Sequence, residues 1–182
     1  MFVDIRGFTS LAERLNPAEL AAQLNRFYEI ASKAIFRYDG TLDKLVGDEV
    51  MAFFGAPLHG RDHPKRAIST ALEVMREVKA VAARDKFGVG IGISTGEAFV
   101  GNVGGKDVTD YTVLGDTVNI AARLQGAAAP GVILLAQETY RQVKNEFPQA
   151  VRRELELKGK SEPVVAWALT DEPQTAIPVE RT

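Results

Sequence analysis

The sequence predicts an α+β domain of the split βαβ type, with an antiparallel-rich sheet and helices on one face. Three observations support this fold class. Three segments carry apolar residues at helical spacing, short apolar runs bounded by glycine lie between them, and several of these runs are close enough in sequence to pair as hairpins. The 182 residues correspond to about one domain, which we place at residues 1–170, with 171–182 as a loose tail.

The first expected elements are a strand and a long helix. Residues 1–5 (MFVDI) have the composition of the end of an apolar strand. Asn16, Pro17 and Glu19 are the residue types preferred at the N-cap, first and third positions of a helix, and Gly40 is expected to end that helix. Its apolar face consists of Leu20, Leu24, Phe27, Ala31, Ala34, Ile35 and Tyr38.

A hairpin and a second long helix come next. Residues 41–54 contain two short apolar runs on either side of Gly47-Asp48, which predicts a β-hairpin that turns at these residues. His63-Pro64 begins the second helix. Its apolar face consists of Ile68, Ala71, Leu72, Met75, Val78 and Ala82.

The rest of the chain alternates strands with shorter helices. Val89, Ile91 and Ile93 alternate with glycine, which predicts a strand with one almost bare face and room there for a close neighbour or a ligand. The remaining expected elements are strands at 98–103, 111–114, 132–135, 151–157 and 164–169, a third helix that begins at Asp116-Thr117, and a short helix near 137–144.

Composition excludes several classes of protein. The chain has no Cys, so a disulfide scaffold, a cysteine nucleophile and a Cys-ligated metal site are excluded. The net charge of −2, without basic and aromatic residues interleaved on a strand, argues against a nucleic-acid-binding domain of similar fold. No apolar stretch is long enough to span a membrane and no secretion signal opens the chain, so we expect this segment to make no membrane contact and to be cytoplasmic, although a longer protein containing it could be membrane-attached.

Two aspartates stand where strands end. Asp4 closes the first apolar run and Asp48 lies in the hairpin turn. One interpretation is ordinary turn and capping chemistry. The other is a metal site, because two carboxylates on adjacent strands could share a pair of Mg²⁺ ions with substrate phosphates.

Other polar residues could bind a substrate. Asn119 and Arg123 are spaced i, i+4 on the third helix and therefore share one face, where they form either a solvated stripe or part of a site. Gly7-Phe8-Thr9 precedes a short helix, whose first N–H groups are suited to phosphate. A turn at Lys158-Gly159-Lys160 can be interpreted as a solvated hairpin turn without a further role.

Three segments together resemble the class III nucleotidyl cyclases. They are FVDIRGFT at 2–9, KLVGDE at 44–49 and YTVLGDTVNIAARL at 111–124, and the resemblance extends over about residues 1–170. It implies the ferredoxin-like cyclase homology domain and conversion of a nucleoside triphosphate into a 3′,5′-cyclic monophosphate and pyrophosphate.

The resemblance also implies roles for individual residues. Asp4 and Asp48 would ligate two Mg²⁺ or Mn²⁺ ions, with the Ile5 carbonyl as a further ligand. Asn119 would orient the ribose and Arg123 would stabilise the α-phosphate in the transition state. The residues expected to hold the other phosphates are Gly7, Phe8 and Thr9, through their backbone, and Lys158, or less favourably Lys160.

The positions that select the base in this family carry Lys44 and Thr112. Lysine donates to adenine N1 and a threonine hydroxyl can accept from adenine N6, whereas guanine has N–H donors that lysine cannot satisfy. We therefore expect ATP as the substrate. Threonine at position 112 resembles the class IIIb subclass, which is often stimulated by bicarbonate, so bicarbonate is a possible effector, although no bicarbonate site is visible in the sequence.

The resemblance implies a homodimer in which each active site takes the metal carboxylates from one chain and Lys44, Thr112, Asn119 and Arg123 from the other. A monomer should be inactive. Two alternatives to an adenylyl cyclase are a guanylyl cyclase, which Lys44 disfavours, and a catalytically silent nucleotide-binding dimerisation module, which the presence of Asp4, Asp48 and Arg123 disfavours.

Overall fold

A seven-stranded sheet forms the centre of the molecule in the computed structural model, which describes residues 1–57, 60–85, 87–157, 159 and 162–170. The strand order is β2-β3-β1-β4-β7-β9-β8, and β4 and β7 are parallel while the other neighbours are antiparallel. The strands are β1 (Phe2–Arg6), β2 (Thr41–Val46), β3 (Glu49–Phe53), β4 (Gly88–Ile93), β7 (Val132–Ala136), β8 (Val151–Leu155) and β9 (Val164–Leu169). The first four have the split βαβ arrangement, so the predicted fold class is confirmed.

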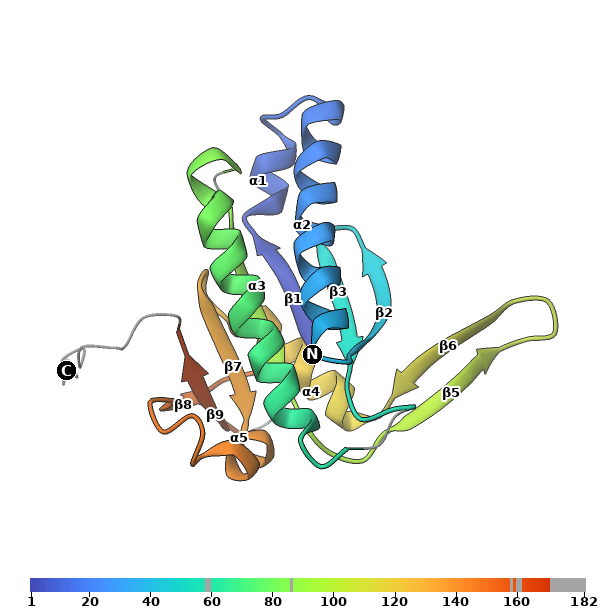
Figure 1. Cartoon of the computed structure of the whole chain (residues 1–182), viewed down its shortest axis with the longest axis vertical. Helices are drawn as coiled ribbons and strands as arrows, with labels where there is room; N and C mark the ends of the chain where they lie inside the picture. The colour runs from blue at the N-terminus through green and yellow to red at the C-terminus, as the bar shows by residue number, and fades with distance from the viewer. Residues whose placement is uncertain (58–59, 86, 158, 160–161, 171–182) are drawn as a thin grey trace.

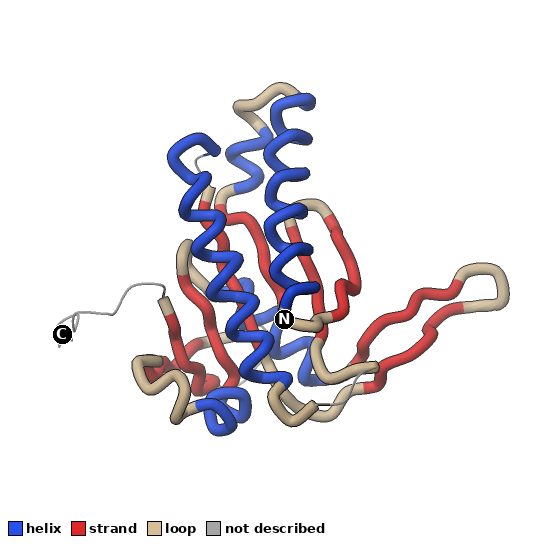
Figure 2. Tube along the Cα trace, viewed as in Figure 1, coloured by secondary structure: helices blue, strands red, loops and turns tan. Residues whose placement is uncertain are grey.

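Two long helices cover one face of this sheet, α2 (Pro17–Arg37) and α3 (His63–Asp85), as Figures 1 and 2 show. The core lies between them and the sheet, because every second residue of β1 and β4 points to this side. The short α5 (Gln137–Val143) also contributes Val143 to this core. The fully buried residues of this core include Val3, Phe27, Ile35, Val50, Ile68, Val74, Ile91, Ile133 and Leu135.

The opposite face is covered in part by α4 (Asp116–Ala127), so the prediction of helices on one face was incomplete. The reason is the bare glycine face of β4. A Cβ built on Gly92 would lie 2.1 Å from Ala121 O and 2.3 Å from Gln125 N, which are backbone atoms of the helix. Glycine therefore lets α4 pack directly against the strand, and the close neighbour that the pattern predicted is this helix.

Substitution of Gly92 should test this packing. We expect Gly92→Ala to destabilise the domain by roughly 2–3 kcal/mol, because the methyl group would displace helix backbone in a packed core. Urea unfolding at fixed protein concentration measures the change. Gly126→Ala is the matched control: Gly126 is helical with nothing within 4 Å of the added carbon. It should stabilise by about 0.5–1 kcal/mol, and equal effects at the two positions would contradict this account.

The strands β5 (Phe99–Gly104) and β6 (Thr109–Leu114) form a separate two-stranded sheet. The sequence predicted a single sheet, so this part of the prediction was wrong. Figure 1 shows this pair projecting from the body of the molecule, and we call it the β5–β6 arm. Large apolar side chains are exposed along it, with Val108 exposed to 77%. A solvated hairpin does not need such residues, so the arm has the composition of a contact surface.

Local signals placed the remaining elements correctly. Asn16 Oδ1 accepts from Glu19 N at 3.0 Å, and Glu19 Oε2 accepts from Asn16 N at 3.3 Å, the reciprocal cap expected from these residue types. The end of α2 differs from the prediction. Asp39, with φ +52°, takes the left-handed position after the helix, while Gly40 is needed because a Cβ there would lie 2.5 Å from the ring of Phe54. Among the described residues, no helix has the length and apolarity needed to cross a membrane.

Candidate active site

The structure brings Asp4 and Asp48 together at one edge of the β1–β3 pair. Asp4 pairs with Glu49 in the ladder, and Ile5 N donates to Asp48 O at 3.2 Å. Since Val3 and Ile5 point into the core, Asp4 points to the opposite face, the one on which α4 packs, and its ion-pair partner Arg6 donates to Gln125 O of that helix at 3.0 Å. The Asp4 carboxylate is therefore partly buried on this face, and the turn that carries Asp48 lies close to it.

A backbone conformation and a hydrogen bond stabilise the turn that carries Asp48. Gly47 has φ +60°, the left-handed conformation that a two-residue hairpin turn of the primed type requires. The Tyr28 hydroxyl on α2 donates a short hydrogen bond to the Gly47 carbonyl. Burial and the nearby Asp48 charge raise the pKa of Tyr28, so this phenol stays protonated as a donor. The long helix thus positions the turn.

Negative charge is concentrated at this point. Burial raises the pKa of the Asp4 carboxyl, Arg6 opposes this with Nη2 3.1 Å from Asp4 Oδ1, and the Asp48 charge raises the pKa further. Burial, Asp4 and Asp48 also raise the pKa of Glu49. Carboxylates that repel one another in a half-buried position favour a bound cation, so the donor set fits a hard divalent ion. Among the described residues, no three His, Cys, Asp or Glu side chains form a complete metal cage, so water, backbone or phosphate oxygens would complete the coordination.

A second polar group lies on β2 and β6. Lys44 Nζ donates to Asp43 Oδ1 at 2.9 Å and forms a short ion pair with Asp110 on the β5–β6 arm. Thr112 Oγ1 lies 2.8 Å from Asp43 Oδ2, and Thr112 is buried. Hydrogen bonds to Asp110 and Asp43 raise the pKa of Lys44, so Lys44 is a cation. The two residues predicted to select the base are thus joined through one carboxylate.

A third group lies on α4. Asn119 is exposed and Arg123, one turn later, is partly buried, so both are on a side of the helix that is not packed against the sheet. Gly159 lies close to this face, because a Cβ on it would be 3.7 Å from Arg123 Nη2. The turn predicted to supply a phosphate-binding lysine is therefore beside Arg123. Lys158 and Lys160 themselves lie outside the described residues, as does the tail at 171–182.

The predicted phosphate loop begins the short helix α1 (Phe8–Ala12). Gly7 is its N-cap with φ +75°, a left-handed conformation that favours glycine. Phe8 packs against the main core, whereas Gly7 and Thr9 are exposed. Asp4, Ile5 and this loop follow one another in the chain, so a ligand at the carboxylates would lie next to the helix start.

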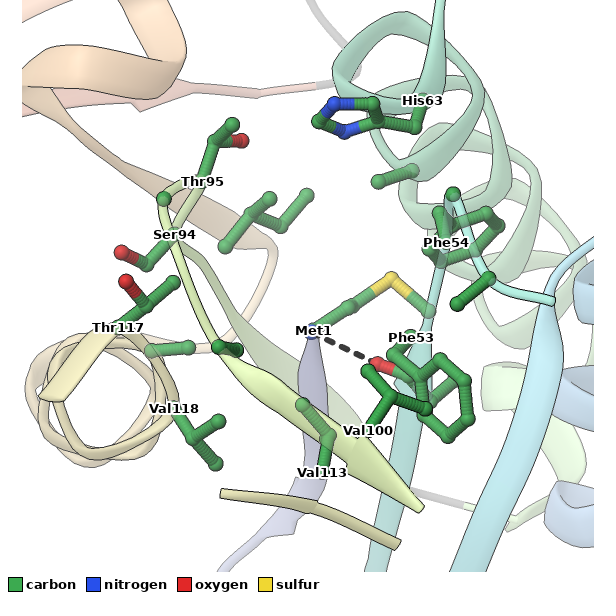
Figure 3. A pocket seen from close by; sticks show the side chains of 18 of the residues that line it. Met1, Phe53, Phe54, His63, Ser94, Thr95, Val100, Val113, Thr117 and Val118 are labelled. Atoms are coloured by element: carbon green, nitrogen blue, oxygen red, sulfur yellow. Dashed lines mark hydrogen bonds between the residues drawn. The ribbon is translucent and has the colours of Figure 1, made fainter. Parts of the chain in front are cut away.

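A cavity of about 570 Å³ lies elsewhere in the chain (Figure 3). Ser94, Thr95 and Thr117 stand on one side of it and His63 and Phe53 on the other. None of the candidate residues described above is among those that line it. The carboxylate, base-selecting and α4 groups are therefore separate from this cavity.

These features agree with a comparison to known families. A family model described as the adenylate and guanylate cyclase catalytic domain matches residues 1–171. The chain belongs to this family.

Solved structures extend the match to the whole cyclase domain. The adenylyl cyclase CyaB from P. aeruginosa superposes with a TM-score of 0.85 at 35% identity, covering 94% of this chain and 92% of that one. The guanylyl cyclase Cya2 superposes with a TM-score of 0.84 at 32% identity, covering 92% and 88%. Structures of both activities therefore share this fold.

A curated relative gives a similar result. Adenylate cyclase 1 of Rhizobium meliloti (strain 1021) is 37% identical over 132 residues, which are 69% of this chain and 20% of that protein. The adenylate cyclase of Anabaena cylindrica is also matched over only 35% of its length. The chain thus spans a minor part of the length of these curated relatives.

The sequence patterns did not indicate several residues around the candidate site. Tyr28 was assigned to no role, and Arg6 and Glu49 were not recognised as neighbours of Asp4. Asp43 was also missed. The signal that could have indicated a role for Asp43 is its position within a predicted strand, directly before Lys44, because Asp is depleted in strands.

Proposed function

We propose that this chain is an adenylyl cyclase domain that converts ATP into 3′,5′-cyclic AMP and pyrophosphate in a homodimer. The observation that carries the proposal is the group formed by Lys44, Asp43 and Thr112. Lys44 offers a cationic donor to adenine N1, and the Thr112 hydroxyl can accept from the amino group at adenine C6. Both side chains are hydrogen-bonded to the buried Asp43 carboxylate. This base-reading group occurs together with the paired carboxylates in one cyclase domain.

The roles of the other residues follow from their positions. Asp4, Asp48 and the Ile5 carbonyl would hold two divalent cations, Mg²⁺ or Mn²⁺, which when bound would activate the attacking 3′-oxygen and neutralise the phosphates. Gly7, Phe8 and Thr9 would bind the β- and γ-phosphates through backbone N–H groups. Asn119 would orient the ribose.

Arg123 would act on the reacting phosphate. In cyclisation the ribose 3′-oxygen bonds to the α-phosphorus while the bond to pyrophosphate breaks, so negative charge builds on the α-phosphate oxygens. A guanidinium held in place before the reaction stabilises that charge without reorganisation. The turn beside Arg123 would add Lys158 to the same phosphates.

Exposed apolar residues support a dimer with shared sites. They lie at the end of β2 and along the β5–β6 arm, the two parts of the molecule that carry Lys44 and Thr112. These residues are Leu45, Val46, Phe99, Val108, Tyr111 and Leu114. A second copy of the chain would bury them and bring its carboxylates opposite Lys44 and Arg123, completing two identical sites around a two-fold axis.

A guanylyl cyclase is the second candidate, because Cya2 shares the fold at 32% identity. Lys44 argues against it, since a cation that only donates cannot accept from guanine N1–H or N2–H₂. Thr112 also relates the domain to the bicarbonate-responsive subclass, and bicarbonate is a candidate effector for that reason.

The test is product formation from ATP and from GTP, each with Mg²⁺ or Mn²⁺, at several protein concentrations. We expect cyclic AMP from ATP, a rate with ATP at least about tenfold above that with GTP, and a specific rate that rises with protein concentration as dimers form. The same assay with bicarbonate and with chloride at constant pH tests the effector. Absence of any cyclic product from folded, dimeric protein would instead support a silent binding module.

A further inference from the structure

A β-bulge on β2 places Asp43 next to the base-selecting residues. Leu42 pairs with Ala52 and Lys44 pairs with Met51, so Asp43 is an extra residue with no partner of its own on β3. In a regular strand the side chains of positions 43 and 44 would point to opposite faces. The bulge turns both to one side, and bulges of this kind often redirect a side chain beside an active site.

The Asp43 carboxylate is fully enclosed and uses both oxygens. Its side chain is 0% exposed, whereas Lys44 and Asp110 are 35% and 54% exposed. Oδ1 accepts from Lys44 Nζ at 2.9 Å and Oδ2 is 2.8 Å from Thr112 Oγ1. A buried carboxylate is costly unless it is paired in this way, so its presence calls for a function.

The chemistry of these partners determines where protons lie. An ionised carboxylate can only accept, so the Thr112 hydroxyl must donate its hydrogen to Asp43. The lone pairs of Thr112 Oγ1 then remain for another donor. Lys44 has three N–H groups, of which Asp43 and Asp110 take two, and one remains for an acceptor such as adenine N1.

We propose that Asp43 is a positioning residue for base selection, which commits the Thr112 hydroxyl to accept from the 6-amino group of adenine. Without Asp43 the hydroxyl could rotate and donate to a 6-oxo group equally well. With Asp43 present, the 6-oxygen of a 6-oxo purine would face the lone pairs of Thr112 Oγ1, and two acceptors that face each other repel. Asp43 thus both favours a 6-amino purine and disfavours a 6-oxo purine, and this inference rests on the proposed function.

The variant Asp43→Asn should reverse this polarity at nearly constant volume. Lys44 can only donate, so the amide oxygen of the new side chain must face it and the amide NH₂ must face Thr112. The NH₂ would donate to Thr112 Oγ1 and turn the hydroxyl hydrogen toward the substrate. A 6-oxo purine would then gain a hydrogen bond where a 6-amino purine loses one.

The experiment measures kcat/KM for ATP, for ITP and for purine riboside triphosphate, which lacks any 6-substituent. We expect Asp43→Asn to lower the ratio of ATP to ITP by at least about tenfold, because one hydrogen bond is lost and one is gained. The ratio of ATP to purine riboside triphosphate should also fall, by about threefold or more. Equal loss of activity with all three substrates would overturn the proposal, since it would indicate a structural role.

Two further variants sharpen the test. Asp110→Asn removes the other carboxylate on Lys44 but does not touch Thr112, so the ATP to ITP ratio should stay within about twofold of wild type. In a Thr112→Val background, Asp43→Asn should leave the ratio unchanged, because no hydroxyl remains to orient. A change of ratio in that background would overturn the proposal.

Failure of the proposed function is distinguishable from failure of this inference. If the wild-type protein makes no cyclic product, the same ratios are taken from dissociation constants of ATP and ITP measured by calorimetry with Mg²⁺. A lower ATP to ITP preference in Asp43→Asn would then support the inference although the domain is not a cyclase. Binding of neither nucleotide to the wild-type protein would overturn both.

Discussion

Asp48→Ala should lower the rate of cyclic AMP formation by at least about 100-fold, while the protein stays folded. Asp48 lies in the hairpin turn next to Asp4, and the charges of the two carboxylates repel in the absence of a cation. Loss of one carboxylate would weaken the binding of divalent ions, which stabilise transition-state charge by several kcal/mol. The measurement is the rate at saturating ATP across a range of Mg²⁺ and Mn²⁺ concentrations.

A matched variant separates charge loss at the site from charge loss in general. Glu146→Ala removes an exposed carboxylate on the segment after α5, and its activity should equal that of the wild type. Thermal unfolding of both variants checks the fold, because the Asp48 backbone, which accepts from Ile5 N, is unchanged by the substitution. Undiminished activity of folded Asp48→Ala would exclude the two-metal interpretation of Asp4 and Asp48.

Mixing Asp48→Ala with Arg123→Ala protein should restore activity that neither variant has. If each site takes its carboxylates from one chain and Arg123 from the other, a mixed dimer has one site with both lesions and one intact site. With free exchange of chains, half of the dimers are mixed, and we expect about a quarter of the wild-type rate. The measurement is cyclic AMP formation as a function of the mixing ratio, with a maximum near equal amounts.

The control for mixing uses two lesions on the same side of the site. Asp4→Ala mixed with Asp48→Ala leaves a lesion in the carboxylate pair of every site, so no recovery is expected at any ratio. Recovery in this control would mean that the chains do not contribute as proposed. Failure of the Asp48→Ala and Arg123→Ala mixture to recover, with chain exchange verified, would mean that each site is built within one chain.

Much of the fold could be predicted because its signals are local. The cap at Asn16 and Glu19 depends on residues three positions apart, and the hairpin turn at Gly47 depends on one left-handed residue. The bare side of β4 showed that something must lie close to Gly92, since the absence of side chains is visible in the sequence itself. That this neighbour is α4, on the second face of the sheet, required the tertiary structure.

The separation of the β5–β6 arm from the main sheet is a further example. Its strands carry the same alternating pattern as those of the main sheet, so the pattern predicts strands but not their partners. Which strands pair depends on contacts between segments far apart in the chain. The exposed apolar residues of the arm, such as Val108 and Tyr111, became informative only when the arm was seen to project from the body.

The fold class, the family resemblance and the residue types of the candidate site could be inferred from the amino-acid sequence, because motif spacing and apolar periodicity are properties of the chain. The contacts that connect these residues depend on the folded arrangement of the strands. The bulge that turns Asp43 toward Lys44, and the approach of β6 that places Thr112 on the same carboxylate, join positions 69 residues apart. No periodicity encodes such a contact, because it arises when packed elements bring polar groups together and burial then requires each of them to have a partner.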